Sequence, residues 1–191
     1  MKKLMTQVSR YHPLLVTLHW LLAVLIIAAL FVGFFLLAKM PNADPHKIRI
    51  LLVHMSVGML ILALMVIRFI VRMLTAKPAA AATGSPLLDR MAPVIHYGFY
   101  LLVLLMVASG YATAILAGLN KSVFQHSGDP LPPSFEAYPS FAAHGYLAAL
   151  LAAFIALHVV AALFHQFVRK DHLFRRMLFG KRVATPAAAA E

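Results

Sequence analysis

The stretch that decides the expected fold is Tyr138–Lys170, YPSFAAHGYLAALLAAFIALHVVAALFHQFVRK. It is apolar over about thirty residues, which is long enough for a helix to cross a bilayer. It also contains His144, His158 and His165. Ionisable side chains are costly inside a membrane, so they indicate a functional site by default. The stretch therefore predicts a membrane-spanning helix that carries part of such a site.

The spacing of two of these histidines sharpens the prediction. His144 and His158 are fourteen residues apart, which is nearly four helical turns. They should project from the same face of the helix, about 21 Å apart along its axis. One helix would then present imidazoles near both sides of the membrane.

Composition places the whole chain in the membrane class. Of its 191 residues, 62% are hydrophobic and 12% are charged, about half the charge of a soluble domain. The chain has no cysteine, which excludes disulfides, cysteine-ligated clusters and covalent attachment of a c-type haem. A metal would need histidine, methionine or oxygen ligands.

The apolar runs predict an all-α integral membrane protein, a bundle of four transmembrane helices. The expected spans are residues 14–38, 49–73, 93–119 and 139–168. Residues 1–13 form a basic lead, 14–176 the transmembrane domain and 177–191 a tail. We expect a small-residue linker over 77–86, a lid over one end of the bundle from 120–140, and no ordered structure over 179–191.

The lysines and arginines predict the orientation. Thirteen lie at the N-terminus, between the second and third spans, or in the C-terminal segment, and four lie on the other side of the membrane. This bias places both termini in the cytoplasm. The basic charge is then a topology signal and a contact with anionic lipid rather than a nucleic-acid surface.

Depth in the membrane pairs four histidines. His19 and His158 both lie in the cytoplasmic halves of their spans, and we call them the inner pair. His54 and His144 both lie near the outer ends of theirs, and we call them the outer pair. A single buried histidine more often bonds a neighbouring helix than a metal, but four at matching depths favour ligation. Two imidazoles facing each other in a bundle core suit haem iron.

Other side chains have candidate roles around these pairs. His96 competes as an inner ligand, although a role beside the ligands or at a substrate is preferred for it. The candidates for contact with haem propionates are Lys47 and Arg49 near the outer pair, and Arg10, Arg68 and Arg72 near the inner pair. The candidates for a quinone pocket are His96, Tyr100 and His165.

The predicted spans contain no Asp or Glu. Proton and cation transporters usually carry carboxylates inside the membrane, so this pattern disfavours that class. No hydrolytic or phosphate-binding motif is present either. We therefore assign no catalytic side chain.

Several motifs together resemble the prokaryotic cytochrome b561 family. They are RYHPLLVTLHWL at Arg10–Leu21, His54-x3-Gly58, HYGFYLL at His96–Leu102, SGY at Ser109–Tyr111, and H-x13-H-x6-H running into HQFVRKDHLFRRML. The resemblance extends from about Arg10 to Leu178. It implies a four-helix inner-membrane protein with two b-type haems, each held by two histidines, that exchanges electrons with the quinone pool. The matching ligands are His19, His54, His144 and His158.

The expected function is that of a membrane oxidoreductase, a di-haem cytochrome that carries single electrons across the membrane. The resemblance implies ubiquinone as the quinone, and superoxide or a periplasmic redox protein as the other partner. One alternative is a cytochrome b subunit that anchors a periplasmic dehydrogenase or hydrogenase. An alternative from another class is a histidine-based metal ion transporter. No oligomeric state is predicted.

Overall fold

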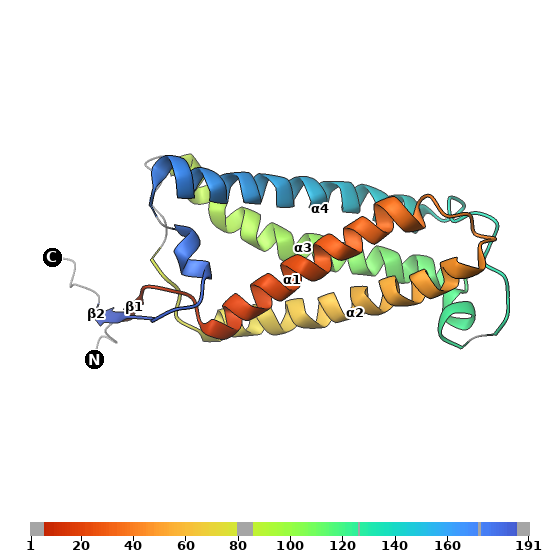
Figure 1. Ribbon diagram of the computed structural model, residues 1–191, viewed down its shortest axis with the longest axis horizontal. Coiled ribbons are helices and arrows are strands. Elements are labelled where there is room, and N and C mark those ends of the chain that lie inside the picture. Colours follow the sequence, from red (N-terminus) through yellow and green to blue (C-terminus); the bar gives the residue numbers. More distant parts are fainter. Residues whose placement is uncertain (1–5, 80–85, 126, 172, 187–191) are drawn as a thin grey trace.

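Four long helices form an elongated bundle in the computed structural model (Figure 1). The structure describes residues 6–79, 86–125, 127–171 and 173–186. The long helices are α1 (Pro13–Phe31), α2 (Pro45–Leu74), α3 (Pro86–Leu116) and α4 (Pro139–Phe164). All four are long and apolar enough to cross a membrane. The prediction of an all-helical four-span membrane bundle is confirmed.

Proline marks the start of every long helix. Pro13, Pro45, Pro86 and Pro139 are their first residues. Proline suits this position because its fixed φ is helical and its missing N–H needs no partner there. The helix α3 therefore begins at residue 86, earlier than the expected residue 93. Residues 80–85 of the expected linker lie outside the described residues.

Short helical segments extend or follow the long helices. The π-helical η1 (Val32–Leu37) continues α1, and the π-helical η3 (His165–Arg169) continues α4. The segment η2 (Asn120–Phe124) is also π-helical, and η4 (Leu173–Met177) is a 3₁₀ helix. Lys170 ends η3 in the left-handed conformation, with φ of 55°. This turn leads the chain back across the end of the bundle toward η4.

The bundle is built from two helix pairs. Helix α1 packs along α2, α3 packs along α4, and the pairs meet mainly through α2 and α3. The core between the pairs is a cluster of six buried side chains, Leu22, Ile61, Met65, Leu102, Val103 and Leu151. A second buried cluster, near η2, includes Val123 and Phe135. Many large apolar side chains are exposed on the helices, as expected of a surface that faces lipid tails.

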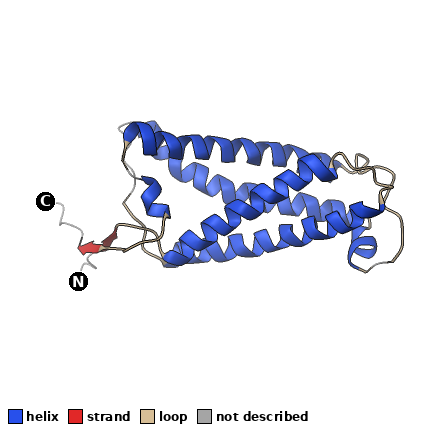
Figure 2. Cartoon of the chain, viewed as in Figure 1, coloured by secondary structure: helices blue, strands red, loops and turns tan. Residues whose placement is uncertain are grey.

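The two ends of the described chain lie at one end of the bundle, and there they are joined by two short strands (Figure 2). Strand β1 (Thr6–Val8) pairs antiparallel with β2 (Ala184–Pro186), with Gln7 opposite Thr185. We call this joined structure, residues 6–12 with 173–186, the terminal clasp. The expectation of no ordered structure over 179–191 is therefore wrong for Ala184–Pro186. Residues 187–191 lie outside the described part of the chain.

Hydrogen bonds to backbone carbonyls hold the terminal clasp together. Arg10 Nη1 donates to the carbonyls of Arg175 at 2.9 Å, Leu178 at 3.0 Å and Phe179 at 3.2 Å. Trp20 Nε1 donates to the Met177 carbonyl at 2.8 Å. A Cβ on Gly180 would lie 3.0 Å from the Arg10 guanidinium, and its φ is 153°. Glycine suits position 180 because it has no Cβ to clash with Arg10 and because it readily adopts a positive φ.

Candidate haem sites

The structure brings the inner pair and the outer pair of histidines together. The ring centres of His19 and His158 are 6.3 Å apart, and those of His54 and His144 are 6.2 Å apart. The inner pair joins α1 to α4, and the outer pair joins α2 to α4. Both pairs therefore bridge the two helix pairs of the bundle, and α4 contributes to each.

These separations suit two imidazoles on opposite sides of one metal ion. A metal–imidazole bond of about 2.0 Å plus a ring radius of about 1.1 Å places the two ring centres about 6.2 Å apart. The unprotonated nitrogen of a neutral imidazole is the ligand atom that such a site requires. Both pairs therefore have the donor atoms and the spacing of a bis-imidazole metal site.

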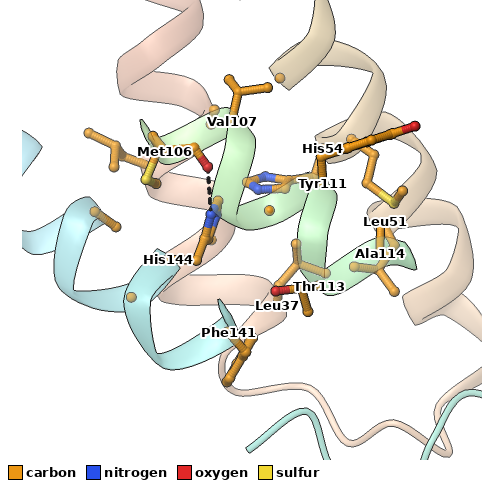
Figure 3. Close-up of a pocket in the computed structure, with 18 of the residues that line it drawn as sticks. Leu37, Leu51, His54, Met106, Val107, Tyr111, Thr113, Ala114, Phe141 and His144 are labelled. Atoms are coloured by element: carbon orange, nitrogen blue, oxygen red, sulfur yellow. Dashed lines mark hydrogen bonds between the residues drawn. The ribbon is translucent and has the colours of Figure 1, made fainter. Parts of the chain in front are cut away.

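A cavity of about 420 Å³ surrounds the outer pair. Its lining is almost wholly apolar and includes Phe34, Leu37 and Phe135. Figure 3 shows His54 and His144 projecting from their helices toward the space between them. An apolar cavity of several hundred Å³ with a few convergent polar groups is typical of a cofactor site.

Two features of this outer cavity fit a flat metal-bound group. The Nδ1 atom of His54 is buried and has no hydrogen-bond partner among the described residues. A Cβ on Gly33 would lie 3.7 Å from Cε1 of His54, so this glycine faces the His54 imidazole. The small residue leaves room beside the ring, and the orphaned ring atom indicates that a partner is absent.

The cavity around the inner pair is smaller, about 210 Å³, and more polar in its lining. Arg68, Arg72, His96 and Tyr100 line it together with the inner pair. Nε of Arg72 and the hydroxyl of Tyr100 are buried without a hydrogen-bond partner in the described structure. Cationic and hydroxyl donors of this kind fit the carboxylates of a bound porphyrin.

His96 stands close to the inner pair as well. Its ring centre is 6.0 Å from that of His158, nearly the same separation as that of His19. Distance alone therefore does not separate the two candidates. Burial does, because His19 is partly buried whereas His96 is exposed. The more enclosed imidazole is the better ligand for a cofactor buried in the bundle.

The remaining candidates divide between cavity and surface. Lys47 lines the outer cavity, is only 4% exposed, and donates a hydrogen bond to the Met40 carbonyl. Arg49 pairs instead with His46 at 3.1 Å, and neither it nor Arg10 lines a described cavity. Arg10 is engaged in the terminal clasp.

His165 lies apart from both cavities. Its Nδ1 bonds to Asp171 Oδ2 at 2.5 Å, and Arg169 Nε lies 3.7 Å from the same oxygen. Burial alone would raise the pKa of Asp171, but bonds from His165 and the Leu173 N–H, with the nearby Arg169, lower it overall. His165 therefore anchors the turn between η3 and η4.

The contacts that hold His144 could not be predicted from the sequence. Its Nδ1 lies 3.0 Å from the Met106 carbonyl oxygen and 3.1 Å from Ser109 Oγ. Gly110 leaves the space that the imidazole occupies. Small residues within an apolar span often mark close helix packing. The adjacent Ser109 and Gly110 therefore indicated a close helix contact, but not that His144 makes it.

Comparison with known proteins identifies the family of the chain. The family model described as prokaryotic cytochrome b561 matches residues 10–180. The "Probable superoxide oxidase CybB" of Yersinia pestis is 29% identical over 181 residues, covering 91% of this chain and 98% of that protein. The "Cytochrome b562" of Cereibacter sphaeroides is 32% identical over 179 residues, with the same coverage of both chains. The "Cytochrome b561 homolog 2" of Escherichia coli (strain K12) is 28% identical over 174 residues, covering 89% and 92%.

Proposed function

Because this chain belongs to the prokaryotic cytochrome b561 family, we propose that it is a di-haem cytochrome that carries electrons between the two sides of the bacterial inner membrane. Its role as a b-type cytochrome in electron transport follows from the family and from its cytochrome relatives. The observation that carries the di-haem proposal is the presence of two facing imidazole pairs at 6.3 Å and 6.2 Å.

In this proposal the inner pair holds one haem and the outer pair holds the other. Haem b, when bound, supplies reversible one-electron chemistry at its iron. Each pair would supply two imidazole nitrogens to hold its haem, and the haem would then supply electron transfer rather than chemistry on a bound substrate. The apolar lining excludes water around the outer pair. Arg68 and Arg72 supply positive charge beside the inner pair, which favours the binding of propionates.

The orientation in the membrane rests on charge. Strands β1 and β2 lie at one end of the bundle (Figure 1), the end at which α1 begins and α4 ends. His19 near the start of α1 and His158 near the end of α4 lie toward that end. The same end holds most of the lysines and arginines, including Arg68, Arg72 and Arg176. The positive-inside rule assigns this end to the cytoplasm. Electrons would then pass between an outer site near the periplasm and an inner site near the cytoplasm.

We infer that the electron partners are superoxide on the outer side and ubiquinone. The superoxide oxidase name of the Yersinia pestis relative supports the first partner. So does Lys47, a buried cation in a cavity lined by no acidic residue among those described, because a cation attracts an anionic substrate. For quinone, Tyr100 and His96 in the inner cavity are the candidate hydrogen-bond partners.

Difference spectroscopy and haem counting test the di-haem proposal. Purified protein should show a reduced-minus-oxidised b-type spectrum with two haems per chain. His54→Ala and His144→Ala should each remove the same haem, and His19→Ala and His158→Ala should each remove the other. A folded, colourless preparation from haem-replete cells would contradict the proposal. If His96→Ala lost the inner haem and His19→Ala kept it, the second inner ligand would be His96 rather than His19.

The superoxide proposal has a separate test. Lys47→Met should slow the reduction of the outer haem by superoxide several-fold and leave the fully dithionite-reduced spectrum of that haem unchanged. Lys47→Arg, which keeps the positive charge, should retain most of the rate. Equal rates for the wild type and Lys47→Met would exclude a role for Lys47 in attracting superoxide.

A further inference from the structure

The two histidines of the outer pair are held very differently. His144 lies against α3, with Nδ1 3.0 Å from the Met106 carbonyl oxygen (Figure 3). The same Nδ1 lies 3.1 Å from Ser109 Oγ. Nδ1 of its partner His54 is buried without a hydrogen-bond partner among the described residues. One imidazole of the pair is thus anchored through its ring nitrogen and the other is not.

The hydrogen bonds define which nitrogen of His144 carries the proton. A backbone carbonyl only accepts, so Nδ1 must be the protonated atom if it bonds to Met106. Ser109 Oγ donates its own hydrogen to the same carbonyl at 2.8 Å, which turns a lone pair of the hydroxyl toward Nδ1–H. Nε2 is then the unprotonated nitrogen of the ring, which is the form that binds iron.

The shape of α3 supports the same placement. A Cβ on Gly110 would lie 2.9 Å from Cε1 of His144 and 3.1 Å from its Nδ1. Only glycine therefore allows the imidazole to approach the Met106 carbonyl at hydrogen-bond distance. Ser109 and Gly110 together form a seat, a hydroxyl acceptor beside a gap in the helix surface, into which the ring fits.

We propose that Ser109 and Gly110 are positioning residues of the outer haem site, a role that rests on the di-haem function proposed above. Gly110 admits the His144 ring, and Ser109 with the Met106 carbonyl keeps its Nδ1 protonated and hydrogen-bonded. A hydrogen bond from Nδ1–H increases the electron donation of the other ring nitrogen to a metal. The seat therefore favours the oxidised state of the outer haem and has no effect on the inner one.

The first test is a redox titration of Ser109→Ala with its two haems bound. Loss of a hydrogen bond of about 1 kcal/mol corresponds to a change of about fivefold in an equilibrium. At a fixed ambient potential, the ratio of reduced to oxidised outer haem should rise by about fivefold, and the ratio for the inner haem should stay constant. The outer haem is identified as the one that His144→Ala lacks.

Ser56→Ala is the matched control for the redox titration of Ser109→Ala. Ser56→Ala removes a hydroxyl from an exposed position on α2 that lines neither cavity, so both haems should titrate as in the wild type. A change below twofold in Ser109→Ala would overturn the role of Ser109. An equal change at both haems would overturn it as well.

Gly110→Ala gives an independent test of the seat. The added methyl should displace His144, so that the outer haem is bound in substoichiometric amount or shows a high-spin electron paramagnetic resonance signal. Full occupancy with the low-spin signal of the wild type would overturn the role of Gly110. If His144→Ala itself retained both haems, the ligand assignment would fail. If it lost one haem while the Ser109 and Gly110 variants behaved as wild type, the seat alone would fail.

Discussion

Replacing Arg10 by alanine should open the terminal clasp. The Nη1 atom of Arg10 reaches three carbonyl oxygens at 2.9, 3.0 and 3.2 Å. One nitrogen carries two hydrogens, so these contacts amount to about two hydrogen bonds, each worth about 1 kcal/mol at a partly exposed position. Their loss, about 2 kcal/mol, should increase the opening equilibrium of the clasp by about 30-fold.

Hydrogen exchange measured by mass spectrometry checks this magnitude. Peptides covering residues 173–186 should exchange about 30-fold faster in Arg10→Ala, whereas peptides from the middle of α2 and α3 should be unchanged. Arg10→Lys keeps the charge but loses the paired hydrogens of a guanidinium, so it should recover only part of the protection. Arg49→Ala, at the other end of the bundle, serves as the control. A change below twofold in Arg10→Ala, or an equal one in Arg49→Ala, would refute the reasoning.

Three further predictions follow from other parts of the structure. The pKa of Asp171 is lowered chiefly by the bond from His165. The ionised Asp171 carboxylate therefore stabilises the fold above its unfolded-state pKa of about 3.9, and this stabilisation is lost as the pH falls through the lower folded value. Hydrogen exchange of Leu173 and its neighbours in η4 should rise in that pH range, and Asp171→Asn should abolish the pH dependence. Val123→Ala, at a fully buried position, should lower the free energy of unfolding by about 1–3 kcal/mol, measured by thermal melts. Leu157→Ala, at an exposed position, is the near-neutral control. Equal melting temperatures for Val123→Ala and the wild type would contradict the close packing around Val123. Depleting haem should destabilise the protein by about 4 kcal/mol for each haem lost, if haem is present at about a thousand times its dissociation constant, because each histidine pair bridges the two helix pairs. An unchanged melting temperature would argue against that bridging.

The apolar runs were enough to predict the helical architecture. Four stretches long enough to cross a bilayer leave few alternatives to a helix bundle, since a membrane requires backbone groups to be paired within each segment. Depth along the chain also predicted which histidines lie close together. His19 and His158, and likewise His54 and His144, face each other at ring-centre distances near 6 Å.

The sequence was less informative about contacts that depend on rotation of one helix against another. Depth along the chain does not reveal which face of α3 meets α4, so the bond between Ser109 and His144 could not be predicted. Arg10 and Lys47 looked alike as cations near the histidine pairs. Only the structure shows that Arg10 turns toward the C-terminal carbonyls while Lys47 turns into the outer cavity.

The terminal clasp also determines the order in which the two cavities are completed during synthesis of the chain. Arg10 and its acceptor in Leu178 are 168 residues apart, so this contact forms only after nearly the whole chain has left the ribosome. Met177, which lines the inner cavity, is held by Trp20 from the first helix. The outer cavity, by contrast, is complete once α4 has inserted its first turns with His144. During synthesis the outer cavity is therefore finished first, and the inner one remains open until the segment around Met177 folds back onto it.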